Sequence, residues 1–211
     1  MSVSIWGLFV LLGVAPSGQW ELVSGRGPGV ADYAGQLTVE PRGFSYLLRW
    51  DTTEGEFSGV GMQAGQRLVA GWGTGRGYGL GVFEIRRDGT LLGRWTEPAA
   101  VGMQGRETWI PLDPERGLSG AYRVEGSLPA LGGNYEGMLE VKEVDGAYRL
   151  TWSVLEETYL GIGVVRGRRL FVAWGPPEGA GLAVYRVHKR RARGRWIRVD
   201  GVGWGTERLR R

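Results

Sequence analysis

The chain has 211 residues, of which 42% are hydrophobic, so it is long enough for one large domain or for two small domains with packed cores. It contains no cysteine and a single histidine, His188. This composition excludes disulfides, thiolate metal sites and cysteine nucleophiles, and it leaves no second histidine for a metal site. We therefore expect no metal, no cofactor and no enzymatic activity.

The first sixteen residues differ in character from the rest of the chain. Residues 5–14 form an apolar run that is followed by small residues. The run is too short to span a bilayer but has the length of the apolar part of a secretory signal peptide. We expect a signal peptide over 1–16 and a secreted or periplasmic protein with no transmembrane segment after its removal. The alternative is a first buried strand of a cytoplasmic protein.

An internal repeat organises the remainder of the chain. When the sequence is shifted by 102 residues, 17–87 aligns without a gap on 119–189, and 21 of the 71 pairs are identical. After a one-residue deletion the match resumes at "GRW" (93–95 and 194–196), and "GRETW" (105–109) loosely matches "GTERL" (205–209).

The repeat predicts how the chain is divided. We expect a first β-barrel-like repeat at 17–109, a linker rich in proline and charge at 110–118, and a second such repeat at 119–211 that carries a basic hairpin.

Within each repeat the apolar residues recur with the period of a β-strand. Residues 44–50 alternate in polarity, and so do residues 148–152. Turn signals follow about every ten residues, and those of the first repeat lie at 41–43, 52–55, 63–65 and 87–89. We predict an all-β fold of two tandem antiparallel meanders, each with seven to eight strands closed into a small calycin-like barrel or a barrel-like sandwich.

Glycine is the compositional outlier, with 39 residues. Glycine within strands permits the kinks and close backbone approaches that barrel closure requires. The richest stretch, "GWGTGRGYGLG" at 71–81, is not a phosphate loop, because the matching stretch 173–183 has Pro176 and Pro177 in place of two N–H donors. No Gly-Lys-Ser/Thr follows it either. We expect a wide hairpin here.

The repeated motifs resemble those of a known family. They are Y-x-G-x-L-x-V at 33–39 and 135–141, Y-x-L-x-W at 46–50 and 148–152, G-x-W at 93–95 and 194–196, and G-T-E at 205–207. In this combination the chain resembles a family of small exported bacterial β proteins that are often labelled "fibronectin-binding" or left uncharacterised. The resemblance covers each repeat almost whole and implies no binding residues. Leu209 stands where the family tends to have tryptophan.

A second likeness concerns the start of the first repeat. Gly18-Gln19-Trp20 is similar to the G-x-W opening of lipocalin and avidin barrels. This likeness implies a calycin-like barrel.

Repeated aromatic residues are the candidates for a ligand cavity. An eight-stranded barrel is wide enough to be filled by side chains or to hold one small ligand. The rings are therefore either the filling of the core or the walls of a pocket for a small apolar ligand. The candidates are Tyr46, Trp50, Trp72, Tyr148, Trp152 and Trp174.

Positive charge is concentrated in the second repeat. Residues 119–211 carry 16 Lys and Arg against 10 Asp and Glu, within a whole-chain net charge of +4. The densest run, 186–198, either docks on an anionic macromolecule or cell-envelope component, or keeps an exposed strand edge from aggregating. The candidates are Arg186, Lys189, Arg190, Arg191, Arg193, Arg195 and Arg198.

These features favour a non-enzymatic exported binding module that recognises a macromolecule or an anionic surface through its second, basic repeat. The alternative is a carrier that holds a small apolar ligand in an aromatic-lined barrel cavity. A hydrolase is the least favoured class, because the acids shared by the repeats, Glu54 and Glu156, fall in turns rather than across one cleft.

Overall fold

The computed structural model describes residues 15–75, 77–129, 132–201 and 203–211. The described chain forms strands β1 (Gly18–Gly27), β2 (Val30–Arg42), β3 (Ser45–Thr52), β4 (Gly55–Ala64), β5 (Arg67–Gly73), β6 (Gly79–Ile85), β7 (Leu91–Thr96), β8 (Gly105–Pro111), β9 (Gly120–Ser127), β10 (Asn134–Val144), β11 (Ala147–Val154), β12 (Glu157–Arg166), β13 (Arg169–Trp174), β14 (Ala180–His188), β15 (Arg191–Arg198) and β16 (Gly205–Arg210). Two short 3-10 helices, η1 (Pro98–Ala100) and η2 (Pro114–Arg116), lie in connections.

The expected signal peptide at 1–16 falls outside the described residues, except for its last two positions. In the part of the chain that the structure describes, no helix combines the length and the apolar character needed to cross a membrane.

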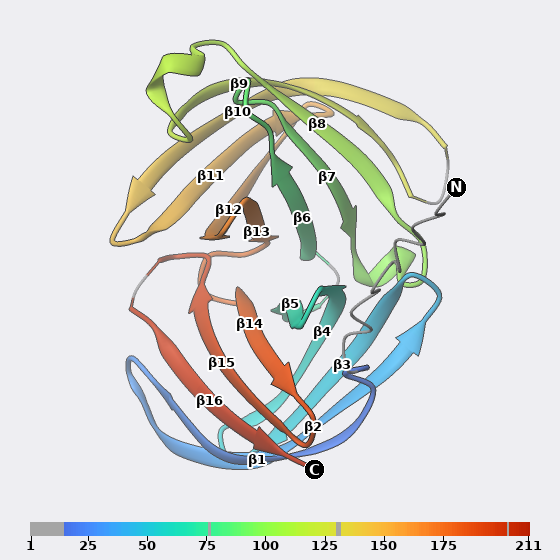
Figure 1. The fold of residues 1–211 in the computed structure, drawn as a ribbon, viewed down its shortest axis with the longest axis vertical. Coiled ribbons are helices and arrows are strands. Elements are labelled where there is room, and N and C mark those ends of the chain that lie inside the picture. Colours follow the sequence, from blue (N-terminus) through green and yellow to red (C-terminus); the bar gives the residue numbers. More distant parts are fainter. Residues whose placement is uncertain (1–14, 76, 130–131, 202) are drawn as a thin grey trace, which may run out of the picture.

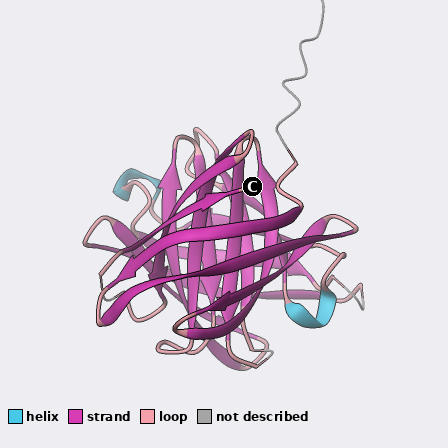
Figure 2. Cartoon of the chain, turned by 90° about the horizontal axis from the view of Figure 1, so that it is seen from below, coloured by secondary structure: helices cyan, strands magenta, loops and turns pink. Residues whose placement is uncertain are grey.

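The strands close into two antiparallel barrels of eight strands each, which lie one above the other in Figure 1. The first barrel has the strand order β1-β16-β15-β14-β5-β4-β3-β2, and the second has the order β10-β11-β12-β13-β6-β7-β8-β9. Figure 2 shows the helices confined to short turns at the periphery. The prediction of an all-β fold with two barrel-like units is confirmed.

The barrels do not coincide with the sequence repeats. Each repeat supplies five strands to one barrel and its last three strands to the other, so that β5 pairs with β14 and β13 pairs with β6. β6 and β14 are equivalent strands of the two repeats, so either could pair with β5. In an unexchanged repeat β5 would pair with β6, whereas here it pairs with β14. The structure thus differs from the expected arrangement of one barrel at 17–109 and one at 119–211.

The exchange changes the role of two connections. The glycine-rich stretch at 71–81 is not a hairpin, since it begins on β5 in the first barrel and ends on β6 in the second. The backbone N–H of Thr74 donates to the carbonyl of Gly179 on the returning crossover at 2.9 Å. The expected linker, by contrast, lies within the second barrel, where β8 and β9 are antiparallel neighbours.

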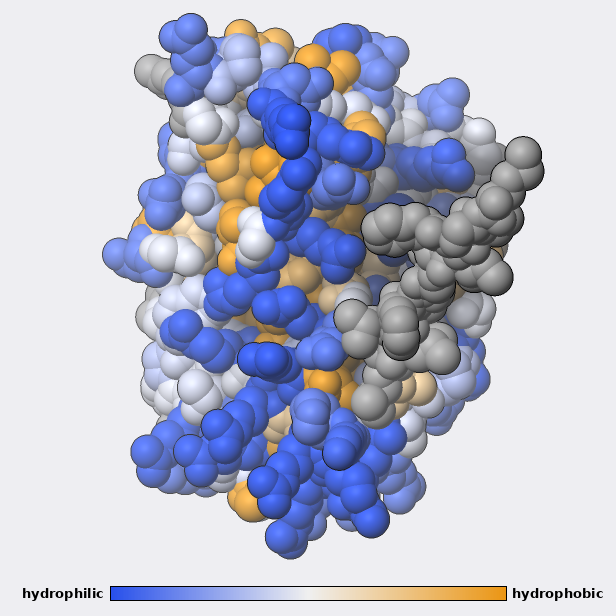
Figure 3. Space-filling view, viewed as in Figure 1, coloured by the Kyte–Doolittle hydropathy of each residue, from blue (hydrophilic) through white to orange (hydrophobic). Residues whose placement is uncertain are grey.

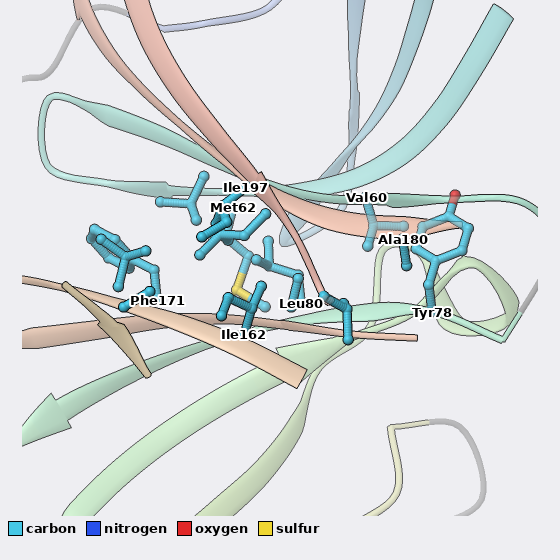
Figure 4. Close-up of a cluster of buried hydrophobic side chains, with 14 of the residues drawn as sticks. Val60, Met62, Tyr78, Leu80, Ile162, Phe171, Ala180 and Ile197 are labelled. Atoms are coloured by element: carbon cyan, nitrogen blue, oxygen red, sulfur yellow. The ribbon is translucent and has the colours of Figure 1, made fainter. Parts of the chain in front are cut away.

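An apolar cluster joins the outer faces of the two barrels. Side chains of β4, β5 and β14 in the first barrel meet those of β6, β12 and β13 in the second, and Figure 4 shows them pointing toward one another. Full burial of these side chains holds the barrels together. The cluster includes Val60, Met62, Val69, Leu80, Leu182, Ile162, Val164 and Phe171.

Glycines inside each barrel lie beneath aromatic rings of neighbouring strands. A Cβ placed on Gly181 would lie 2.5 Å from Trp72, and one on Gly79 would lie 2.0 Å from Trp174. Further pairs of this kind are Gly59 with Trp50, Gly161 with Trp152, Gly205 with Trp196, Gly105 with Trp95, Gly25 with Tyr33, and Gly126 with Tyr135. Much of the glycine excess therefore makes room for rings inside the barrels.

The fit of ring to glycine predicts a stability difference between two alanine variants. Gly181→Ala should destabilise the protein by about 1–3 kcal/mol, because the new methyl group would overlap Trp72 and the carbonyl of Ile197. Gly77→Ala, where a Cβ meets nothing within 4 Å, should change stability by less than about 0.5 kcal/mol. Urea unfolding of both variants checks this, and equal stabilities would contradict the packing described.

Candidate functional site

Each barrel contains an aromatic-lined cavity that is open to solvent. The first cavity, in the first barrel, has a volume of about 210 Å³, and the second cavity, in the second barrel, has a volume of about 160 Å³. Rings of the first cavity come from Tyr33, Trp50, Phe57, Trp72, Tyr185 and Trp196. Rings of the second come from Phe83, Trp95, Tyr135, Trp152, Tyr159 and Trp174.

The cavities bring together four of the six aromatic residues singled out from the sequence. Trp50 and Trp72 line the first cavity, and Trp152 and Trp174 line the second. Tyr46 and Tyr148 do not line either cavity. They are partly buried against the barrel cores, where the Tyr46 hydroxyl group donates to Gln63 Oε1 at 3.2 Å.

A buried carboxyl group lies on the wall of the first cavity. Glu207 on β16 is 6% exposed, and its two oxygens accept hydrogen bonds from the hydroxyl groups of Tyr33, at 2.7 Å, and Tyr185. These two hydroxyls in turn accept from indole N–H groups, Tyr33 from Trp196 at 2.8 Å and Tyr185 from Trp50 at 3.1 Å. The network ties five side chains of five strands together at the cavity wall.

The second cavity has the equivalent carboxyl group with a different set of donors. Glu107 on β8 is 8% exposed and accepts from the Tyr135 hydroxyl group and from the indole N–H groups of Trp109 and Trp152. Buried carboxyl groups need such donors, because an unpaired one costs several kcal/mol.

The two barrels differ at two aligned positions near the carboxyl group, yet each barrel keeps a hydrogen-bond donor to it. The first barrel has Tyr185 and Leu209 where the second has Phe83 and Trp109. The tyrosine hydroxyl group in one barrel and the indole N–H in the other each donate to the local glutamate. The hydroxyl group of Tyr185 therefore supplies the donor that Leu209 cannot provide.

Burial changes the acidity of these groups. Desolvation raises the pKa of Glu107 and of Glu207, although the Tyr and Trp donors act in the opposite direction. Burial, followed by the charge of the neighbouring carboxylate, raises the pKa of Tyr33 and Tyr135. These tyrosines therefore stay protonated and remain hydrogen-bond donors at neutral pH.

Sequence reasoning did not single out the glutamates as site residues. The signal was present in the recurrence of "GRETW" and "GTERL", which places an acid at the same position of the last strand in both repeats. Glu107 alternates with the buried Gly105 and Trp109, and this period-two pattern points its side chain into the barrel. The shared acids Glu54 and Glu156 are exposed, and Glu54 also lines the first cavity.

Two buried nitrogen atoms at the cavities have no hydrogen-bond partner. Among the described residues, Trp95 Nε1 and Arg198 Nε are the buried side-chain nitrogen and oxygen atoms without one. Trp95 lines the second cavity and Arg198 lines the first. The equivalent of Trp95, Trp196, does have an acceptor. Both nitrogen atoms are buried, so neither is presented to the open space of its cavity.

The basic residues singled out from the sequence separate into an outer group and one inner residue. Arg186 on β14, together with Arg191, Arg193 and Arg195 on β15, is exposed on the outer face of the first barrel, and Lys189 and Arg190 form the turn between these strands. Arg198 differs, because it lines the first cavity and forms an ion pair with Asp200 at 3.0 Å.

The strand register aligns four arginines across neighbouring strands of the first barrel. Arg67, Arg186, Arg193 and Arg208 stand opposite one another on β5, β14, β15 and β16, and we call them the arginine row. None of the four forms an ion pair with an acid in the described part of the chain. A surface hollow beside the row is lined by His188, Lys189, Arg190, Arg191, Arg210 and Arg211.

Comparisons with known proteins found no relative of this chain. No protein-family model, curated protein or solved structure matches the chain.

The buried glutamates predict a pH dependence of stability. Burial raises the pKa of both carboxyl groups in the folded state, so as pH increases above about 4.3 they ionise in the unfolded chain first. The free energy of unfolding therefore falls with rising pH, until pH passes the pKa of the folded state. The double variant Glu107→Gln/Glu207→Gln should lack this loss, which amounts to roughly 1.4 kcal/mol for each glutamate and each unit of pKa shift.

Urea unfolding between pH 4 and pH 8 measures this effect. The free energy of unfolding of the native protein should fall with rising pH relative to that of the double variant. The control Glu54→Gln/Glu156→Gln changes two exposed acids and should leave the native slope unchanged. Parallel curves for the native protein and the buried double variant would contradict the prediction.

Proposed function

We propose that this protein is a non-enzymatic carrier that binds one small apolar, aromatic-sized ligand in each barrel. The observation that carries the proposal is the occurrence of the same open aromatic cavity with a buried carboxyl group in both barrels. Rings that served only as filling would leave no such space. A cavity of about 150 Å³ lined by apolar side chains is large enough for benzene, so both cavities suit a single-ring ligand.

The polar groups of the cavities support orientation of the ligand. Ligand pockets combine apolar walls with a few fixed polar groups that provide specificity. Here the glutamate and its Tyr and Trp donors form a rigid polar patch on an otherwise aromatic wall. Export of the carrier by way of the expected signal peptide at 1–16 remains part of the proposal.

Binding of a neutral single-ring probe tests the carrier function. Benzyl alcohol should bind with a stoichiometry of two, and it should shift the indole N–H signals of Trp196 in the first cavity and Trp95 in the second in ¹⁵N-correlated NMR spectra. Ala183→Phe, which places a ring in the first cavity, should abolish the shift at Trp196 and keep the shift at Trp95.

The matched control for this experiment is Ala31→Phe, because Ala31 is exposed on β2. It should leave both sites intact. Failure of benzyl alcohol to shift either indole signal at millimolar concentration would contradict the carrier function.

A second function is favoured by the arginine row, which we propose as a docking face for a linear polyanion. Like charges directly opposite one another destabilise a sheet, so an uncompensated row points to a partner that supplies the negative charge. The equivalent row of the second barrel consists of Arg169, Glu84, Leu92 and Thr108 and carries no such excess. The lower part of the molecule in Figure 3, where the first barrel lies, is covered mainly by hydrophilic residues.

Heparin affinity tests the docking face with matched triple variants. Arg186→Gln/Arg193→Gln/Arg208→Gln should weaken binding at 0.15 M salt by roughly tenfold or more, because polyanion binding depends on the number of cations in contact. Arg86→Gln/Arg94→Gln/Arg106→Gln removes the same charge from exposed positions of the second barrel and should have a small effect. Equal losses in the two variants would mean that net charge, and not this face, governs binding.

A further inference from the structure

We propose that the two cavities differ in the charge of the ligand that they accept, and that the second cavity selects a small aromatic amine as its ammonium ion. The inference rests on the proposed carrier function and adds the chemical class of one ligand. It follows from one position at which the two otherwise similar cavities carry opposite charges.

That position lies two residues after a tryptophan of each cavity wall. In the alignment of the repeats, Trp95 matches Trp196, so Glu97 matches Arg198. Glu97 follows β7 and lines the second cavity, whereas Arg198 ends β15 and lines the first. The equivalent point of the cavity wall is therefore acidic in one barrel and basic in the other.

The charged residues that line the second cavity are all acidic. They are Glu97 and the buried Glu107, and among the described residues no Lys, Arg or His accompanies them on the wall. Burial raises the pKa of both carboxyl groups, and no positively charged side chain among the described residues of the wall offsets this effect. Glu107 already accepts three hydrogen bonds, so the partly buried Glu97 is the acid that is left to pair with a ligand. An ammonium group placed in this cavity would supply the missing positive charge.

The aromatic walls of the second cavity also suit a cation. Trp95 lies edge-to-face against Trp174, with ring centroids 5.6 Å apart, and against Tyr135 at 6.4 Å. Faces of Trp and Tyr attract ammonium groups through their quadrupoles, and the effect grows when water is excluded.

The electrostatic environment of the first cavity is less favourable for an ammonium ion. Arg198 on its wall offers an ammonium ion no acceptor, and the carboxylate of Asp200 is already paired with the guanidinium group at 3.0 Å. Glu54 and Glu178 also line this cavity, but both are exposed, where water and salt screen their charge. Glu207 is the buried acid and is already bonded to two tyrosine hydroxyls.

Three single-ring probes that differ in charge separate the effect of ligand charge on binding from the effect of ligand shape. Benzylamine is an ammonium ion at pH 7, benzyl alcohol is neutral, and benzoate is an anion. The indole N–H signals of Trp95 and Trp196 report the second and first cavities separately. Benzylamine should bind the second cavity about tenfold more tightly than benzyl alcohol does, and more tightly than it binds the first cavity. Benzoate should not bind the second cavity.

Two variants assign the preference to the matched position. Glu97→Gln should weaken benzylamine binding to the second cavity about tenfold and leave benzyl alcohol binding within twofold. The Glu97 side chain makes no capping bond to the following helix, so the variant keeps the local fold. Arg198→Gln should strengthen benzylamine binding to the first cavity and leave the second unchanged.

The outcomes distinguish this inference from the carrier function on which it rests. If benzyl alcohol binds both cavities but benzylamine binds the second no more tightly, or if Glu97→Gln leaves benzylamine binding unchanged, the charge selection is wrong and the carrier function stands. If none of the three probes binds either cavity, both proposals fail.

Discussion

The pairing of β5 with β14 and of β13 with β6 is the constraint on which the rest of the structure depends. Each of these two exchanged pairings joins a five-strand segment of one repeat to a three-strand segment of the other, and the β1–β16 and β8–β9 pairings complete the closure of the two barrels. The same register sets Trp72 over Gly181 and Trp174 over Gly79, so it also builds one wall of each cavity. It further brings the outer faces of β4, β5 and β14 against the second barrel.

Duplication of a cavity allows its two copies to diverge without loss of the fold. Both barrels keep a glutamate from the last strand of a repeat and the rings above glycines, which are the parts that stabilise the interior. They differ in the donors around the glutamate and in the charge of the wall at Glu97 and Arg198. Outside the cavities, the arginine row belongs to the first barrel alone. One chain thus combines two related interiors with one basic face.

The sequence predicts the strands, the repeat and four of the twelve rings on the cavity walls, because period-two polarity and the 102-residue alignment are local properties of the chain. It does not predict the strand exchange, since β6 and β14 are equivalent partners for β5 and the choice between them is made by long-range packing. Nor does it predict that Trp50 lines the first cavity and Tyr46 does not, because residues on the same face of a strand lie at different levels of a barrel. The inward position of Glu107 is readable from its alternation with Gly105 and Trp109, but its hydrogen-bond donors come from strands distant in sequence.

The contact of a single methyl group tests the strand exchange most directly. In the exchanged pairing, Ala183 on β14 stands opposite Ala70 on β5, whereas in an unexchanged repeat the alignment places it opposite Val172 on β13. Directly opposite Cβ atoms lie about 5 Å apart, which is close enough for a methyl–methyl nuclear Overhauser effect. The account predicts such an effect between the methyl groups of Ala183 and Ala70. An effect between Ala183 and Val172 in its place would contradict the exchange and the two cavities built on it.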